Sequence, residues 1–265
     1  MEEKPSVAKD STPKAEAIPP PAKVEGPGDS VEPVKAPVTA DVGNVSCTRL
    51  IFFQPGAEIQ SVSYNAKGEE DSRQFTRVLS VQVKDGFTVA KVDGSDKEAG
   101  EKGKVTNVFY EYKCDGKNIY FDIASMFRTE KKNSDSSFES SPIPFPISVR
   151  AGEQLPDAHG VMSSKRGGRK MSMTYTFKKR KVEEMEEVTT AAGTWNCYKI
   201  SQAIEVEMDI PGMDEKAKAM MKQMQGMMKM TSLTWLSPDF GIVRTEIYLN
   251  GERKSRNDVV SYKTK

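Results

Sequence analysis

Apolar and polar residues alternate along most of this chain after its first 45 residues, with the period of two that is typical of β-strands. The clearest case is residues 171–182, in which methionine, tyrosine and phenylalanine alternate with polar side chains. Short turns that contain glycine separate such runs, as in the hairpin signal Lys84-Asp85-Gly86. The same pattern predicts further strands at residues 58–64, 75–83, 87–92, 105–112, 118–123, 194–207, 231–236, 242–249 and 255–262.

The number of these strands, roughly ten, and the short turns between them favour one antiparallel sheet that curls strongly or closes. A parallel sheet is not expected, because strands and long helical segments do not alternate along the chain. A length of 265 residues could hold one large β domain or two small ones, and length alone does not choose between them. We therefore expect residues 46–265 to form a single, mainly β domain, built on an antiparallel sheet that curls, closes or half-closes.

Residues 1–45 have a different composition, rich in proline, lysine, glutamate, alanine and valine, with Pro19, Pro20 and Pro21 in succession. Such a segment cannot bury enough apolar surface to offset its conformational entropy. Its prolines and interspersed charges are typical of an extended chain with polyproline II character. The sequence therefore predicts a disordered tether, which acts as a spacer or is a dispensable tail.

Residues 211–230 interrupt the β pattern with strong helix formers, and Asp214 and Gly226 are placed to begin and end a helix. Met213, Ala217, Met220, Met224 and either Met227 or Met228 fall on one face at helical spacing. Such a helix could fill the open end of the sheet, cover an apolar ligand as a flexible lid, or bind Cu(I) through thioethers. Methionines on both faces favour the lid over the filler, because they need a partner beyond the neighbouring hairpin.

The charges and polar motifs exclude several functions. Lysine and arginine total 39 and aspartate and glutamate 38, so no general basic footprint indicates nucleic acid or an anionic membrane. The basic run 178–181 extends a strand and is followed at once by the acidic run 183–187. These two runs predict a solvated strand and a solvated turn. No apolar run is long enough to span a membrane as a helix.

The search for catalytic and metal-binding motifs gives no candidate residues. The single histidine, His159, lies in a polar, turn-like context, so a zinc site with paired histidines is excluded. No nucleophile elbow, P-loop or dinucleotide fingerprint is present. We expect no enzymatic activity and no cofactor.

The three cysteines, Cys47, Cys114 and Cys197, are too widely spaced for a zinc ribbon or a redox dithiol motif. In an oxidising compartment Cys47 and Cys114 are the preferred pair. Cys47 lies where the chain enters the β domain and Cys114 lies at the end of a predicted strand, and these two places could meet. The alternative is three reduced thiols. Cys197 alternates with Trp195 and Lys199 and is expected to be an interior packing residue.

Several segments resemble the TapB-like family of exported Bacteroidetes proteins, a group of unknown function. The matching segments are residues 52–56, 64–68, 112–116, 122–126, 188–200, Trp235 and 240–246, so the likeness covers about residues 48–264. The resemblance implies an antiparallel, lipocalin-like or half-open barrel that is usually exported. It supplies no catalytic residues. The expected leader peptide is not part of this sequence, so we expect an extracytoplasmic protein whose leader was removed, with a cytoplasmic location as the alternative.

Together these observations predict a binding module of the cell envelope that is not an enzyme and that holds an apolar small molecule or lipid. The candidate lining or lid residues are Trp195, Tyr198, Trp235, Met220, Met224 and Met227. For the two tryptophans, a role as packing anchors competes with ligand binding. The alternative function is a scaffold that binds an envelope protein through the sheet, and a third possibility is a hydrolase that uses scattered carboxylates.

Overall fold

The computed structural model describes residues 47–100, 102–121, 137–166 and 169–264. The tether expected at residues 1–45, the end of the predicted strand 118–123 and the segment 122–126 lie outside these residues. The described elements are the 3-10 helices η1 (Cys47–Arg49) and η2 (Ile51–Phe53), the helix α1 (Glu215–Met227), and the strands β1 (Glu58–Asn65), β2 (Glu70–Lys84), β3 (Phe87–Glu98), β4 (Val105–Cys114), β5 (Asn118–Phe121), β6 (Ser137–Ser140), β7 (Ile143–Pro146), β8 (Ala158–Arg166), β9 (Arg169–Thr190), β10 (Gly193–Asp209), β11 (Met230–Ser237), β12 (Gly241–Leu249) and β13 (Glu252–Lys263).

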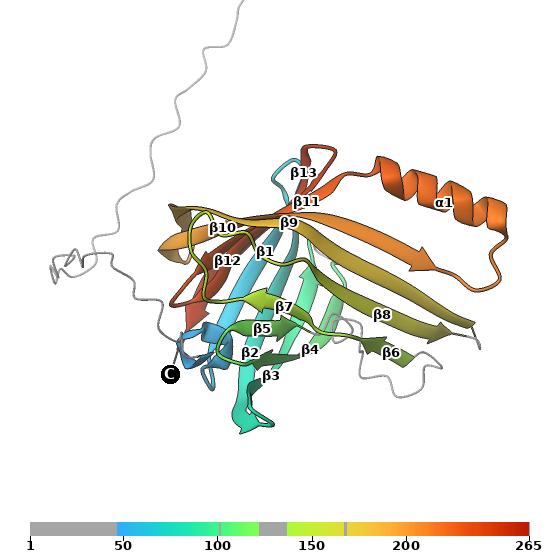
Figure 1. Ribbon diagram of the computed structural model, residues 1–265. Coiled ribbons are helices and arrows are strands. Elements are labelled where there is room, and N and C mark those ends of the chain that lie inside the picture. Colours follow the sequence, from blue (N-terminus) through green and yellow to red (C-terminus); the bar gives the residue numbers. More distant parts are fainter. Residues whose placement is uncertain (1–46, 101, 122–136, 167–168, 265) are drawn as a thin grey trace, which may run out of the picture. The chain divides into compact units, whose positions relative to one another are not determined.

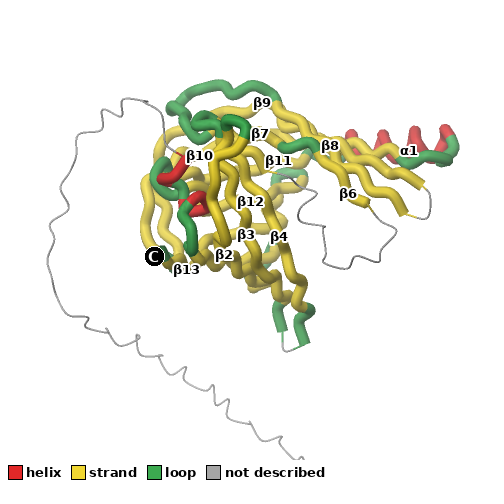
Figure 2. The backbone as a smooth tube through the Cα atoms, turned by 90° about the horizontal axis from the view of Figure 1, so that it is seen from below, coloured by secondary structure: helices red, strands yellow, loops and turns green. Residues whose placement is uncertain are grey.

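All thirteen described strands belong to one sheet, in the order β6-β8-β9-β10-β11-β12-β13-β1-β2-β3-β4-β5-β7. Every neighbouring pair is antiparallel. The sheet curls into a nearly closed barrel, and the far ends of β8, β9 and β10 extend beyond it (Figure 1, Figure 2). The predicted fold class, a strongly curved antiparallel sheet with one short helix, is therefore confirmed.

The two edges of the sheet are joined by one continuous piece of chain. The edge strand β6 pairs with β8, and only two residues later the other edge strand, β7, pairs with β5. Between them, the Ser141 backbone N–H donates to the Val161 carbonyl at 2.9 Å, and the Val161 N–H donates to the Ser141 hydroxyl at 2.9 Å. Gly160 permits the closest approach, because a Cβ atom there would lie 2.6 Å from Cγ1 of Ile143. Closure of the barrel therefore depends on this contact between β7 and β8.

The segment that enters the sheet packs against its main apolar core. Leu50, Ile51 and Phe53 are fully buried, together with Ile59 and Val78. The Gly56 N–H donates to the Val78 carbonyl, and the Val78 N–H donates to the Ala57 carbonyl, both at 2.9 Å. These bonds add the entering chain to the side of β2, so the 3-10 helices form part of the core.

A disulfide bond fixes this entering segment to the end of β4. Cys47 and Cys114, the pair preferred from the sequence, are bonded, with their Cα atoms 6.0 Å apart. Because the bond closes a loop across 67 positions, the chain-entropy model gives it a stabilisation of about 4 kcal/mol. Cys197 is the free cysteine, with no exposed surface, and burial raises the pKa of its thiol to about 11.

The acidic run 183–187 is part of a strand, which corrects the solvated turn expected from the sequence. β9 continues through it to Thr190, where the chain turns back into β10. The register with β10 shifts between Tyr198 and Ile200, so the run contains a bulge. The apolar residues Val182 and Val188 on either side are buried, and their packing sustains the strand through the polar positions.

The contact between β7 and β8 predicts that Gly160→Ala lowers the free energy of unfolding by about 1–3 kcal/mol, because the new methyl group overpacks against Ile143. In urea unfolding experiments, Gly160→Ala combined with Ile143→Ala should cost less than the sum of the two single substitutions. The matched control is Gly226→Ala in α1, where an added Cβ has no atom within 4 Å. If the losses in free energy of unfolding from the two single substitutions simply add in the double variant, the closure does not depend on the close contact between Gly160 and Ile143.

The state of the cysteines predicts how many thiols react with Ellman's reagent at pH 8. The native protein should show none, because the raised pKa and burial keep Cys197 protonated and inaccessible. In denaturant one thiol should react, and all three cysteines should react after reduction. Three reactive thiols in denaturant before reduction would refute the disulfide.

Candidate functional site

The strand β10 is longer than its neighbour β11, and this mismatch creates the candidate site. Pairing between β10 and β11 ends at Ile204 and Met230, whereas pairing with β9 continues as far as Asp209. Residues 205–209 of β10 therefore have no described strand on their second side. An open edge with apolar side chains exposes both its backbone groups and its apolar surface. The chain returns from Asp209 to β11 through α1, which runs beside this edge (Figure 1).

Local sequence determines where α1 begins. Asp214 is the N-cap, as expected, and its Oδ1 atom accepts a hydrogen bond of 2.8 Å from the Ala217 N–H. The predicted end at Gly226 is short by one residue, since the helix includes this glycine and ends at Met227. The Lys229 N–H then donates to Oδ1 of Asn250 at 3.0 Å, which fixes the entry into β11. A side-chain hydrogen bond thus caps the start of the helix, and another fixes the chain just after its end.

Between α1 and β10 lies a groove with a volume of about 590 Å³. This volume is within the range of roughly 300–1,000 Å³ that is typical of small-molecule sites. Its lining is mainly apolar, with charged groups of both signs at the rim. The apolar lining residues are Met173, Ile204, Val206, Met208, Ile210, Met221, Met228 and Met230, and the polar ones are Glu205, Glu207, Asp209, Lys218, Lys222 and Gln225. We call this site the α1 groove.

The charged rim of the α1 groove is partly neutralised by ion pairs. Glu205 pairs with Lys178 at 2.7 Å, and Lys218 pairs with Glu215 at 2.8 Å. The hydrogen bond from Nζ of Lys218 to the Glu215 carboxylate raises the pKa of Lys218, so this side chain stays protonated at neutral pH. The apolar surface therefore dominates what the groove can bind.

The three methionines that the sequence singled out lie outside the groove lining. Met220, Met224 and Met227 are 58 %, 57 % and 62 % exposed. The methionines of α1 and its C-cap that line the groove are Met221, which is not on the predicted face, and Met228, the alternative to Met227 on that face. Both sets have helical spacing, so spacing alone does not identify the set that faces the sheet. The alternation along residues 171–182 and 194–207 is the sequence signal for Met173, Ile204 and Val206.

The aromatic candidates lie in the packed part of the barrel. Trp235 is buried, its Nε1–H donates to the Glu186 carboxylate, and its ring contacts the cationic groups of Lys199 and Arg244. The half-buried ring of Trp195 packs against Phe240, with ring centroids 5.4 Å apart. Neither tryptophan is among the groove lining residues, and their contacts are those of packing anchors.

Tyr198 likewise packs away from the groove. It joins the second apolar cluster, formed by Val149, Leu155, Val182, Ile200 and Leu236. The six candidate residues are therefore not brought together in one site. Three lie on the exposed side of α1 and three in the packed part of the barrel.

Arg180 departs from the solvated strand expected for residues 178–181, since it is only 3 % exposed. Lys179 has a positive φ of 51° at a shift in register between β9 and β10. This bulge turns Arg180 to the face that carries Phe177. Arg180 Nε donates to Gln202 Oε1 and its Nη1 donates to the Pro156 carbonyl, both at 3.1 Å. Its contacts fasten the 152–157 segment to the sheet.

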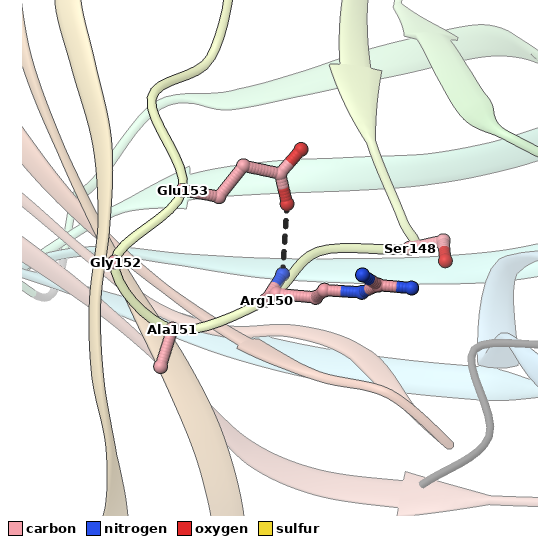
Figure 3. A pocket seen from close by; sticks show the side chains of 5 residues that line it. All are labelled: Ser148, Arg150, Ala151, Gly152 and Glu153. Carbon is pink, nitrogen blue, oxygen red and sulfur yellow. Dashed lines mark hydrogen bonds between the residues drawn. The ribbon is translucent and has the colours of Figure 1, made fainter.

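A second hollow, of about 550 Å³, lies over the loop that follows β7. It is lined by Ser148, Arg150, Ala151, Gly152 and Glu153 (Figure 3). The Glu153 carboxylate accepts a hydrogen bond of 2.9 Å from the Arg150 backbone N–H, and the guanidinium of Arg150 extends away from it. Glu153 is thus used within its own turn, and the few lining residues offer little apolar surface. The α1 groove is the better candidate for a binding site.

The described residues include no group of three or more histidine, cysteine, aspartate or glutamate side chains arranged to hold a metal ion. Within those same ranges, no helix has both the length and the apolar character needed to cross a membrane. His159 lies in β8, opposite Thr176 of β9.

Comparisons with known proteins agree with this fold. One similar solved structure is a "putative exported protein with YmcC-like fold" from Bacteroides fragilis, 19 % identical, with a TM-score of 0.56, covering 81 % of this chain and 100 % of its own. A "putative lipoprotein" from Parabacteroides distasonis is 20 % identical, with a TM-score of 0.58, covering 81 % of this chain and 99 % of its own. At such low identity these likenesses show the fold alone.

No curated protein matches this chain. The model of the DUF3108-like family matches residues 54–262, nearly all of the β domain. The resemblance to the TapB-like family is not confirmed. The two similar structures from Bacteroidetes are described as a "putative exported protein" and a "putative lipoprotein". The extent of the family match is decisive: the chain belongs to the DUF3108-like family.

Proposed function

We propose that this protein is an extracytoplasmic binding module, not an enzyme, which holds an apolar or lipid-like chain in the α1 groove. The observation that carries the proposal is the groove itself, which lies between a helix with no buried residue and an unpaired strand edge. A helix that packs directly on a sheet, with no ligand between them, normally buries its apolar stripe. Here the methionines of the groove keep an accessible apolar surface, and their unbranched side chains adapt to varied ligands.

Two observations support a location outside the cytoplasm. Structural disulfides persist in oxidising compartments, and Cys47–Cys114 joins the entering segment to the main core. The similar solved structures are described as a "putative exported protein" and a "putative lipoprotein". By this likeness, the predicted tether would hold the domain away from an envelope anchor.

The proposal predicts that Met221→Gln with Met228→Gln weakens binding of a C16 fatty acid at least about tenfold. Burying a methionine is worth about 1.5–3 kcal/mol, and every 1.4 kcal/mol corresponds to a factor of ten. Binding would be measured by displacement of a fluorescent fatty acid, and ligands that copurify would be detected by native mass spectrometry.

The matched control is the triple variant Met220→Gln, Met224→Gln and Met227→Gln. It makes the same chemical change on the same helix, outside the groove lining. Glutamine and methionine have similar helix propensities, so both variants should keep α1 folded, which circular dichroism would check. If both variants bind the fatty acid as the wild type does, or if the wild type does not bind it, the proposed groove ligand is wrong.

A further inference from the structure

The second face of α1 has no partner in the described part of the chain. The side chains of Ala217, Met221 and Gln225 are the half-buried ones within the helix. A regular helix turns about 100° per residue, so Met220, Met224 and Met227 lie roughly a quarter turn away from that stripe. We call these three residues the outer methionine stripe. α1 lies alongside the far ends of β9 and β10, with its other side directed away from the sheet (Figure 1, Figure 2).

Positive charge accompanies this apolar stripe. The helix and the turn after it carry Lys216, Lys218, Lys222 and Lys229. Lys218 pairs with Glu215, and both Lys218 and Lys222 line the α1 groove. Lys216 and Lys229 are not among the groove lining residues and form no ion pair with any described residue. A short helix with an exposed apolar stripe and unpaired lysines is complementary to an anionic surface that has an apolar layer beneath it.

The area of the stripe argues against a protein partner. A helix of 13 residues is about 20 Å long and about 10 Å wide, so one side offers on the order of 200 Å². A stable protein interface needs about 800 Å² from each partner. A lipid surface has no such threshold, because its binding strength increases with each apolar side chain inserted and each lysine placed near the headgroups.

From this combination we infer that α1 docks the protein on an anionic lipid surface, with the outer methionine stripe inserted among the lipids and Lys216 and Lys229 at the headgroups. This interaction surface is separate from the α1 groove and does not depend on a groove ligand. In this arrangement Met221 and Met228 face the sheet, while Met220, Met224 and Met227 face the membrane. One helix therefore has two apolar sides with different partners.

The test is sedimentation of the full chain with vesicles of equal parts phosphatidylglycerol and phosphatidylcholine, compared with phosphatidylcholine alone. The wild type should bind the anionic vesicles, and binding should fall as salt is raised from 0.1 M to 0.5 M. The triple variant of the outer methionine stripe should lose at least about tenfold in vesicle affinity. The vesicle affinity of the double variant Lys216→Gln with Lys229→Gln should fall about fivefold for each lysine replaced.

The groove variant, Met221→Gln with Met228→Gln, is the matched control and should bind vesicles as the wild type does. The two methionine sets thus give opposite results in the vesicle and fatty-acid experiments, so failure of either inference is distinguishable from failure of the other. Vesicle binding that is absent in the wild type, insensitive to salt and lipid charge, or unchanged in the triple variant overturns the docking surface. Loss of an envelope protein partner, instead of vesicle binding, in the triple variant would assign the stripe to a protein contact and also overturn it.

Discussion

An unpaired strand edge must be covered, and much of the functional part of this structure follows from that constraint. β9 and β10 contain 22 and 17 residues, whereas β11 has only 8. Beyond Ile204, β10 keeps β9 on one side, but no described strand pairs with it on the other side. The backbone groups and the apolar side chains on that side of β10 would otherwise face water or another chain. α1 occupies the place that a longer β11 would take, and because a helix packs less closely than a paired strand, a groove remains.

A second constraint is the closure of the sheet. A curled sheet of thirteen strands ends in two edges, and this chain joins them through the ten residues 137–146. Gly160 makes the close approach of β7 to β8 possible. The backbone and hydroxyl of Ser141 form hydrogen bonds with Val161 where a continuous row of bonds between the two edges is absent from the described residues. The disulfide between Cys47 and Cys114 holds the entering segment in place. The barrel therefore supplies a rigid base from which the hairpin and α1 extend.

Much of the fold could be predicted because its signals are local. Alternation along β2, β3, β9 and β10 and the capping by Asp214 depend on neighbours in the sequence. The buried Arg180 could not be predicted in this way, because the expectation of a solvated strand rested on the run of charges, whereas the bulge at Lys179 turns this one side chain to the buried face. The strands β6, β7 and β8 were also missed. The proline-containing strand β7 is short, and its pairing with β5 depends on closure of the whole sheet.

The candidate site shows most clearly what each level of structure determines. The sequence by itself determined that a methionine-rich helix lies between two strands, and where that helix begins. Only the tertiary structure decided that Met221 and Met228 line the groove while Met220, Met224 and Met227 lie outside its lining. The physical reason is that both sets satisfy the same helical spacing. The rotation of the helix about its axis is set by the free edge of β10, whose position depends on strand lengths and pairings far along the chain.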